Sequence, residues 1–182
     1  MIQRNDVIAA IATGKSPCAI GIVRLSGAGC AAVAEQVFTL DSGMRLSDAP
    51  NRRLLLGTLR DRHGRVIDQA MAVYCRAPHS YTGEDTVELQ CHGSPAMLAA
   101  ALEALFCAGA RQAGPGEFTK RAFLNGRMDL TQAEAVIDLI DAETADAAAN
   151  AAGQLGGALL RKIAPVYDRL TNLCSHFHAV LD

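Results

Sequence analysis

The residues best suited to chemistry lie on one side of a short predicted strand, Thr86–Cys91. Because side chains alternate across a strand, Val87, Leu89 and Cys91 should point one way and the polar Glu88 the other. The polar side is either a solvated surface or one wall of a pocket, and the pattern does not decide between them. A carboxylate at Glu88 could accept two parallel N–H bonds from a planar amidine-like edge, as it does from arginine.

Two arginines are candidates for binding a carboxylate or phosphate. Arg24 lies at the end of the apolar run Cys18–Leu25, and this run predicts a central strand. Ligands often bind where such strands end, and the guanidinium fork suits a carboxylate or phosphate. The alternative is a structural ion pair with Glu84 or Asp85, and the pattern leaves both open. Arg127 follows a predicted break between two helices, where the pattern alone indicates only a solvated charge near a helix end.

Several familiar reactive arrangements are missing from the sequence. Cys91 and His92 are neighbours on a strand and should face opposite sides, which argues against a nucleophile–base pair. The six cysteines form no C-x-x-C pair and show no zinc-finger spacing, so they indicate reduced thiols. The phosphate-binding motif G-x-x-x-x-G-K-[ST] does not occur. We therefore predict no catalytic residue and no metal site in these 182 residues.

The composition indicates a globular cytoplasmic protein. Half of the residues are hydrophobic, 20% are charged, and the net charge of −2 argues against a strongly basic nucleic-acid binder. The densest positive cluster consists of Arg45, Arg52, Arg53, Arg60, Arg62 and Arg65. No aromatic residues interleave with it, so solvated loops are the favoured interpretation. The sequence predicts neither a signal peptide nor a membrane span.

The pattern of elements predicts an α+β fold. Strands and helices alternate to about Ala113, which indicates a mixed α/β domain over residues 1–117, and residues 118–182 are helical. Three of the predicted helices run from a Ser26 cap to about Phe38, from Thr131 through Ala152 with Asp129 or Thr131 as its cap, and over Ala158–Leu181.

The last predicted helix carries an apolar stripe from Ile163 to Val180, at a spacing of three and four residues. Such a stripe needs a partner, and the Thr131–Ala152 helix can cover only part of it. We therefore expect the chain to be a fragment or part of an oligomer.

Four segments together resemble one known family. They are Cys18–Gly27 (CAIGIVRLSG), Pro78–Gly93 (PHSYTGEDTVELQCHG), Gly114–Leu130 (GPGEFTKRAFLNGRMDL) and Thr131–Ile140 (TQAEAVIDLI). In sequence, order and spacing they resemble the TrmE/MnmE family of tRNA-modification GTPases, and the resemblance spans almost the whole chain.

The resemblance implies a fold and a function. The N-terminal domain would be similar to folate-binding aminomethyltransferases, form a homodimer, and bind 5-formyl- or methylene-tetrahydrofolate through Arg24 and Glu88. A helical domain would follow, with an inserted G domain that uses GTP, Mg and K. With an FAD-dependent GidA/MnmG-type subunit, the full enzyme would modify carbon 5 of the wobble uridine of certain tRNAs.

Three departures from the family pattern bear on these expectations. Arg127 stands where the family usually has lysine; it keeps the charge but not the point-like geometry. The loop Gly14–Cys18 has fewer glycines than usual. The chain is expected to stop before the G domain, so we expect no GTP hydrolysis from it alone. The hypotheses, in order, are a folate-binding dimerisation module, a purely structural dimerisation module and a stand-alone one-carbon transferase.

Overall fold

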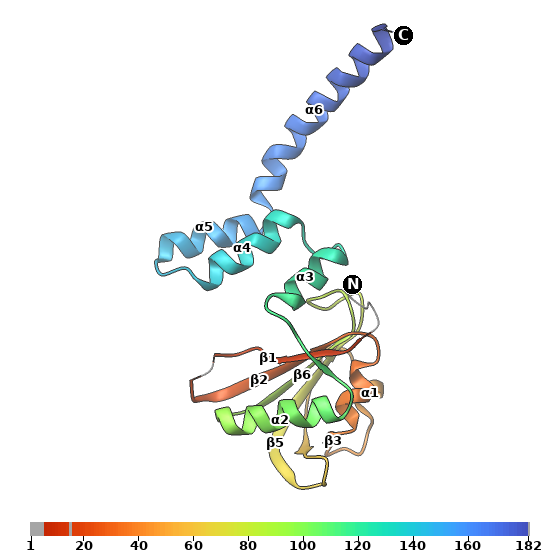
Figure 1. Ribbon diagram of the computed structural model, residues 1–182, viewed down its shortest axis with the longest axis vertical. Helices are drawn as coiled ribbons and strands as arrows, with labels where there is room; N and C mark the ends of the chain where they lie inside the picture. Colours follow the sequence, from red (N-terminus) through yellow and green to blue (C-terminus); the bar gives the residue numbers. More distant parts are fainter. Residues whose placement is uncertain (1–5, 15, 182) are drawn as a thin grey trace. The chain divides into compact units, whose positions relative to one another are not determined.

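The computed structural model describes residues 6–14 and 16–181, and the chain divides into two compact units, Met1–Arg127 and Met128–Asp182. The first unit is built on one seven-stranded sheet of order β3-β4-β5-β6-β2-β1-β7 (Figure 1). Its strands are β1 (Ile8–Ile11), β2 (Cys18–Ser26), β3 (Phe38–Leu40), β4 (Leu54–Arg60), β5 (Val66–Cys75), β6 (Thr86–Gly93) and β7 (Arg111–Gln112). Paired strands are antiparallel, except that β1 and β7 are parallel. Strand β2 lies inside the sheet, as its apolar sequence predicts.

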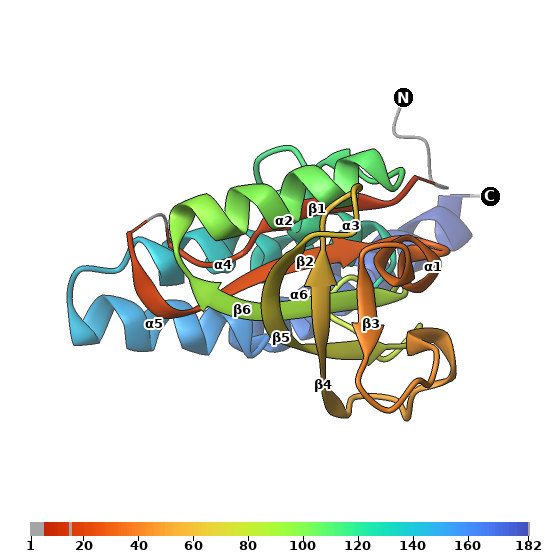
Figure 2. The same cartoon turned by 90° about the horizontal axis from the view of Figure 1, so that it is seen from below.

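One face of the sheet forms the core of the first unit. Helices α1 (Cys30–Glu35) and α2 (Pro95–Cys107) cover this face, and Figure 2 shows α2 beside β1 and β2, running in roughly the same direction as these strands. The side chains of Val23 and Leu25 on β2, and of Val87 and Leu89 on β6, are completely buried there. Burial of such apolar side chains is the main source of stability in a fold of this kind.

The opposite face of the sheet, here called the open face, carries the alternate residues of the same strands. Ile20 on β2 is 59% exposed and Leu56 on β4 is 51% exposed. The strand register aligns Ile22, Gln90, Met71 and Leu56 across four neighbouring strands. The described residues of the first unit therefore leave an uncovered, partly apolar sheet surface.

The helix predicted after Ser26 is present, but its predicted cap and both predicted ends are wrong. The Ser26 hydroxyl does not cap it but contacts Thr82 and Glu84 instead. Helix α1 begins only at Cys30, after Gly29 at φ 83°, and it is six residues long. Strand β3 and a short 3-10 turn, η1 (Leu46–Asp48), follow where a helix end and a loop were expected.

The second unit contains helices α4 (Leu130–Ile140), α5 (Ala145–Leu155) and α6 (Ala158–Leu181). Asp129 caps α4 through a capping box with Gln132, which confirms one of the two predicted caps. The continuous helix predicted over Thr131–Ala152 is wrong, because α4 ends at Ile140 and a separate helix begins at Ala145. Thr144 then caps α5 by accepting a hydrogen bond from Ala147 N.

Helix α6 carries the predicted apolar stripe on an exposed surface. Val166 is 56% exposed, Leu170 57% and Phe177 61%, while the side chain of Val180 lies outside the described residues. Pro165 lies within the helix. None of the described helices is both long enough and apolar enough to cross a membrane.

Helix α3 (Glu117–Leu124) belongs to the first unit and follows Gly116, which adopts φ 65°. A positive φ of this size favours glycine, so Gly116 allows the sharp entry into α3. The first turn of α3 carries Glu117, Phe118 and Thr119. This helix therefore supplies side chains to the polar region described below.

We predict that Gly21→Ala destabilises the first unit. A methyl group at Gly21 would lie 2.7 Å from Leu98 Cδ2, and Leu98 is only 2% exposed, so the core must shift to admit it. Overpacking of this kind costs about 1–3 kcal/mol in the free energy of unfolding, which urea titration can measure. In a Leu98→Ala background the same change should be nearly neutral.

Gly14→Ala is the matched control, because a Cβ at Gly14 would meet nothing within 4 Å. Equal losses for Gly21→Ala in both backgrounds would show that the contact with Leu98 is not the cause.

Candidate functional site

Arg24 and Glu88 form an ion pair on the open face. They are direct partners in the β2–β6 register, and Arg24 Nε lies 2.7 Å from Glu88 Oε1. Each side chain keeps 25% of its surface exposed. The predicted alternative, an ion pair of Arg24 with Glu84 or Asp85, is wrong, because Arg24 pairs with Glu88.

Two aromatic rings lie beside this pair. The Arg24 guanidinium carbon lies 5.1 Å from the centre of the Tyr81 ring and 5.7 Å from that of Phe118. These distances are typical of cation–π contacts. The Tyr81 hydroxyl is 2.9 Å from Thr119 Oγ1, which links the loop before β6 to α3. Sequence reasoning missed both rings, although aromatic residues make up only 4% of the chain and could have been singled out.

Arg127 lies against the same loop. Its Nε donates to the Ser80 carbonyl at 3.1 Å, and Asn125 Nδ2 donates to the Thr82 carbonyl at 2.8 Å. A Cβ at Gly83 would lie 2.9 Å from Arg127 Cγ, so the loop and the arginine stem are close. Arg127 is exposed, as the pattern predicted, but it also holds the loop that carries Tyr81.

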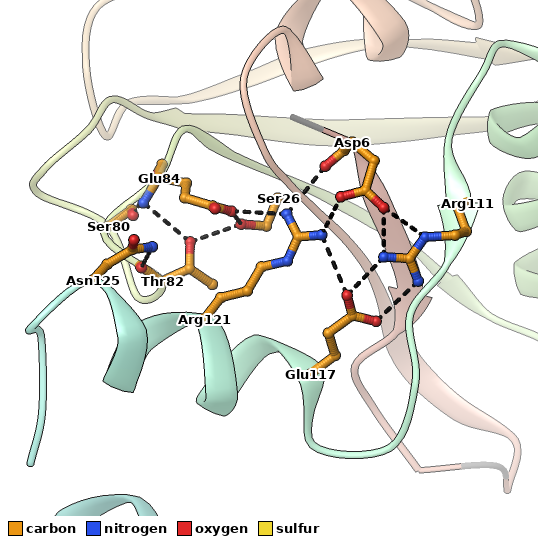
Figure 3. A network of polar contacts seen from close by, with 9 residues as sticks. All are labelled: Asp6, Ser26, Ser80, Thr82, Glu84, Arg111, Glu117, Arg121 and Asn125. Carbon is orange, nitrogen blue, oxygen red and sulfur yellow. Dashed lines mark hydrogen bonds and ion pairs between the residues drawn. The ribbon is translucent and has the colours of Figure 1, made fainter. Parts of the chain in front are cut away.

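A network of ion pairs surrounds the buried side chain of Arg121 (Figure 3). Arg121, only 3% exposed, contacts Asp6 at 2.6 Å, Glu84 at 3.1 Å and Glu117 at 3.2 Å. Arg111 joins it by contacting Asp6 at 2.6 Å and Glu117 at 2.7 Å. The network therefore joins the chain before β1, the loop before β6, strand β7 and helix α3. Sequence reasoning did not single out any of its members except Glu84.

Hydroxyl groups extend this network into the loop. The Ser26 Oγ lies 2.7 Å from Thr82 Oγ1 and donates to Glu84 Oε2 at 2.9 Å. The Ser80 hydroxyl donates to the Glu84 carbonyl. The loop between β5 and β6 is thus fixed by bonds to the sheet, to Arg121 and to the end of α3.

The network changes the titration of its carboxyl groups. Hydrogen bonding from Arg111, reinforced by the Gly114 amide and by Arg121, lowers the pKa of Glu117 to about 2. For Asp6, burial acts to raise the pKa, but the hydrogen bonds from Arg111 and Arg121 outweigh it, and the pKa is lowered. Both groups are therefore held as carboxylates near neutral pH.

Cys91 and His92 have separate environments. Burial raises the pKa of the Cys91 thiol to about 12, and Cys91 is only 4% exposed. The His92 ring instead contacts Asp68, with Nδ1 2.8 Å from Asp68 Oδ1. Within the described residues no three His, Cys, Asp or Glu side chains are grouped to hold a metal ion.

The arrangement is suited to binding rather than to bond cleavage. Glu88 presents a partly exposed carboxylate, Arg24 a partly exposed cation, and Tyr81 and Phe118 flat apolar surfaces. In the described residues, only Arg24 is hydrogen-bonded to the Glu88 carboxylate, through Oε1. Such a site can take a planar ligand with a pair of N–H donors on one edge.

Comparisons with known proteins cover both units. Residues 7–127 match the family model described as GTP-binding protein TrmE N-terminus, and residues 130–182 match the MnmE helical domain. The tRNA modification GTPase MnmE of Symbiobacterium thermophilum is 49% identical over 178 residues, and one from Thermus thermophilus is 51% identical over 179 residues. These alignments cover 98% of this chain but only 39% and 41% of the two relatives.

We predict that Glu117→Gln reduces the loss of stability in acid. The pKa of Glu117 in the folded protein lies below its ordinary value of 4.5. The contribution of its carboxylate to the free energy of unfolding is therefore complete above about pH 4.5 and is lost as the pH falls toward about 2. Urea unfolding at neutral and at acidic pH should show that the variant is less stable near neutrality, by on the order of 1–3 kcal/mol, with a smaller acid dependence.

The control for this experiment is Glu103→Gln, at an exposed position of α2. It should keep the wild-type dependence on pH. A Glu117→Gln variant with the wild-type acid profile would mean that the network does not stabilise the carboxylate.

Proposed function

Since the chain belongs to the TrmE/MnmE family of tRNA modification GTPases, we propose that its first unit binds a one-carbon tetrahydrofolate at the Arg24–Glu88 pair. The ligand would be 5-formyl- or methylene-tetrahydrofolate. The observation that carries the proposal is the partly exposed setting of the pair beside two aromatic rings.

The chemistry of the pair fits the pterin end of a folate. The 2-amino-pyrimidinone edge of a pterin presents two parallel N–H donors, which a carboxylate such as Glu88 can accept. Tyr81 and Phe118 offer flat surfaces for a ring system. Arg24 both orients Glu88 and leaves its terminal nitrogens for ligand oxygens, since among the described residues its hydrogen bond is through Nε alone.

Arg127 is proposed as a third folate-binding residue. Its Nε is held by the Ser80 carbonyl at 3.1 Å, at the end of the site where the loop and α3 meet. Its remaining N–H groups would then be free to contact an oxygen at the pterin end. A lysine could supply the charge there but not this fixed fork.

The wider role is that of a tRNA-modifying enzyme in the cytoplasm. We propose that the full protein, with an FAD-dependent GidA/MnmG-type subunit, adds a carboxymethylaminomethyl-type group to carbon 5 of the wobble uridine. GTP hydrolysis, with Mg and K, is assigned to a G domain outside these 182 residues. The residues present would supply the folate and the scaffold for the dimer, with no catalytic residue among them.

Dimer formation is proposed through the open face. Leu54 and Leu56 on β4 are both more than a third exposed there. Soluble monomers rarely leave such an apolar surface uncovered, and a second copy would bury the same surface on both chains. A dimer formed this way would also bring two Arg24–Glu88 pairs toward one interface.

We predict that Glu88→Gln weakens binding of 5-formyl-tetrahydrofolate by about 1–3 kcal/mol, the scale for losing a charged hydrogen-bond partner. Isothermal titration calorimetry on the 182-residue chain measures this directly. Unchanged affinity in the variant would rule out Glu88 as a ligand contact.

A charge-swapped double variant separates ligand binding from structure. Arg24→Glu with Glu88→Arg can restore the cross-strand ion pair, because the two residues are direct partners in the register. It should restore thermal stability but not folate affinity. Full affinity in the swapped protein would mean that the pair is only structural.

We predict that Leu56→Glu converts the dimer to a monomer, because it places charge in the apolar centre of the open face. Light scattering gives the mass. Val66→Glu is the matched control, as Val66 is 57% exposed but lies next to the β4–β5 hairpin turn. A monomeric wild type, or a dimeric Leu56→Glu variant, would contradict the proposed interface.

A further inference from the structure

A second polar cluster lies at the end of β6 away from Glu88. His92 Nδ1 is 2.8 Å from Asp68 Oδ1, and the main-chain N–H of His92 donates to Asp68 Oδ2 at 2.8 Å. The pairing of β5 with β6 ends at Met71 and Gln90, so the Asp68 carboxylate takes the place of the next strand partner. The Asp68 side chain is only 7% exposed, whereas that of His92 is 75% exposed.

This contact gives the histidine a fixed orientation. A carboxylate on one ring nitrogen selects the tautomer and the direction of the ring. With Nδ1–H donated to Asp68, Nε2 is the ring nitrogen left to face a ligand. When Nε2 also carries a proton, it can donate a charge-assisted hydrogen bond to a ligand carboxylate.

A hollow of about 180 Å³ adjoins the His92 ring. Gln69, Gln90 and His92 contribute polar groups to its lining, and Ile20 and Met71 contribute apolar ones. Two amides, an imidazole and two apolar side chains match a short aliphatic chain that carries an amide and a carboxylate. The glutamate end of a folate has this composition.

The spacing along β6 matches an elongated ligand. Glu88, Gln90 and His92 are alternate residues of one strand and share a face, so Glu88 and His92 lie about 13 Å apart at 3.3 Å per residue. A folate carries paired N–H donors at one end and carboxylates at the other. It could therefore lie along the strand, with Gln90 between its two ends.

We infer that His92, oriented by Asp68, binds the glutamate carboxylate of the folate whose pterin end lies at Glu88. This inference rests on the proposed function of the Arg24–Glu88 pair. Arg127 is the competing cation for the glutamate, but it lies beside the Ser80 carbonyl, near the start of β6 rather than its end. Binding of the glutamate by His92 and binding by Arg127 would therefore place the folate tail in opposite directions along β6.

The test compares two ligands by calorimetry on the 182-residue chain. They are 5-formyl-tetrahydrofolate and 5-formyl-tetrahydropteroate, which lacks the glutamate. His92→Gln should weaken the first about tenfold, the effect of losing one charge-assisted hydrogen bond, and leave the second within about twofold. His63→Gln, at the exposed turn between β4 and β5, is the matched control and should change neither affinity.

Asp68→Asn provides a second variant, since it keeps the shape of the residue but removes the charge behind His92. It should weaken the glutamate-bearing ligand selectively, and thermal unfolding checks that the variant is folded. Equal losses for both ligands in His92→Gln, or none, would overturn the inference. The wild type should bind the glutamate-bearing ligand more tightly than the pteroate. If Arg127→Gln removes this difference and His92→Gln keeps it, the tail lies near Arg127 at the start of β6.

Failure of the proposed function gives a different result. If the wild type binds neither ligand, the folate site itself is wrong and this inference falls with it. If Glu88→Gln weakens both ligands while His92→Gln weakens neither, the folate site stands and only the assignment of the tail is wrong.

Discussion

The buried guanidinium of Arg121 is the interaction on which the candidate site depends. It holds three segments that are far apart in the sequence, through Asp6 before β1, Glu84 in the loop before β6 and Glu117 in α3. A buried charge is costly unless it is paired, so removing any one carboxylate weakens the reason for the others to stay together. Arg121 Nε is buried without a hydrogen-bond partner among the described residues, so the terminal nitrogens carry the binding.

The sheet and this network contribute different parts of the site. The β2–β6 register alone places Arg24 opposite Glu88. The network fixes the loop and helix that bring Tyr81 and Phe118 to the guanidinium of Arg24. An ion pair on an open sheet face would otherwise be a solvated surface feature of little energetic weight. The two rings add flat apolar surfaces beside the pair, and the proposed binding of a planar ligand relies on them, which connects the folding of the first unit to its proposed role.

The sequence predicted several local features, although it missed the break between α4 and α5, and it predicted long-range contacts poorly. Alternation on β6 gave the correct sides for Glu88 and Leu89, and the capping residue Asp129 marked the start of α4. The Ser26 cap failed because its hydroxyl is bonded to residues 56 and 58 positions away. The partners of Arg121 could not be predicted for the same reason, since no periodicity relates positions 6, 84 and 121. Family resemblance supplied Arg24 and Glu88 as a pair, but not their contact with each other.

The most direct test of the account is a crystal structure of the chain with 5-formyl-tetrahydrofolate. We predict that the 2-amino edge of the pterin lies within hydrogen-bonding distance of the Glu88 carboxylate, beside Tyr81 and Phe118. A pterin bound elsewhere, with the Arg24–Glu88 pair and its rings left as they are in the free protein, would contradict it.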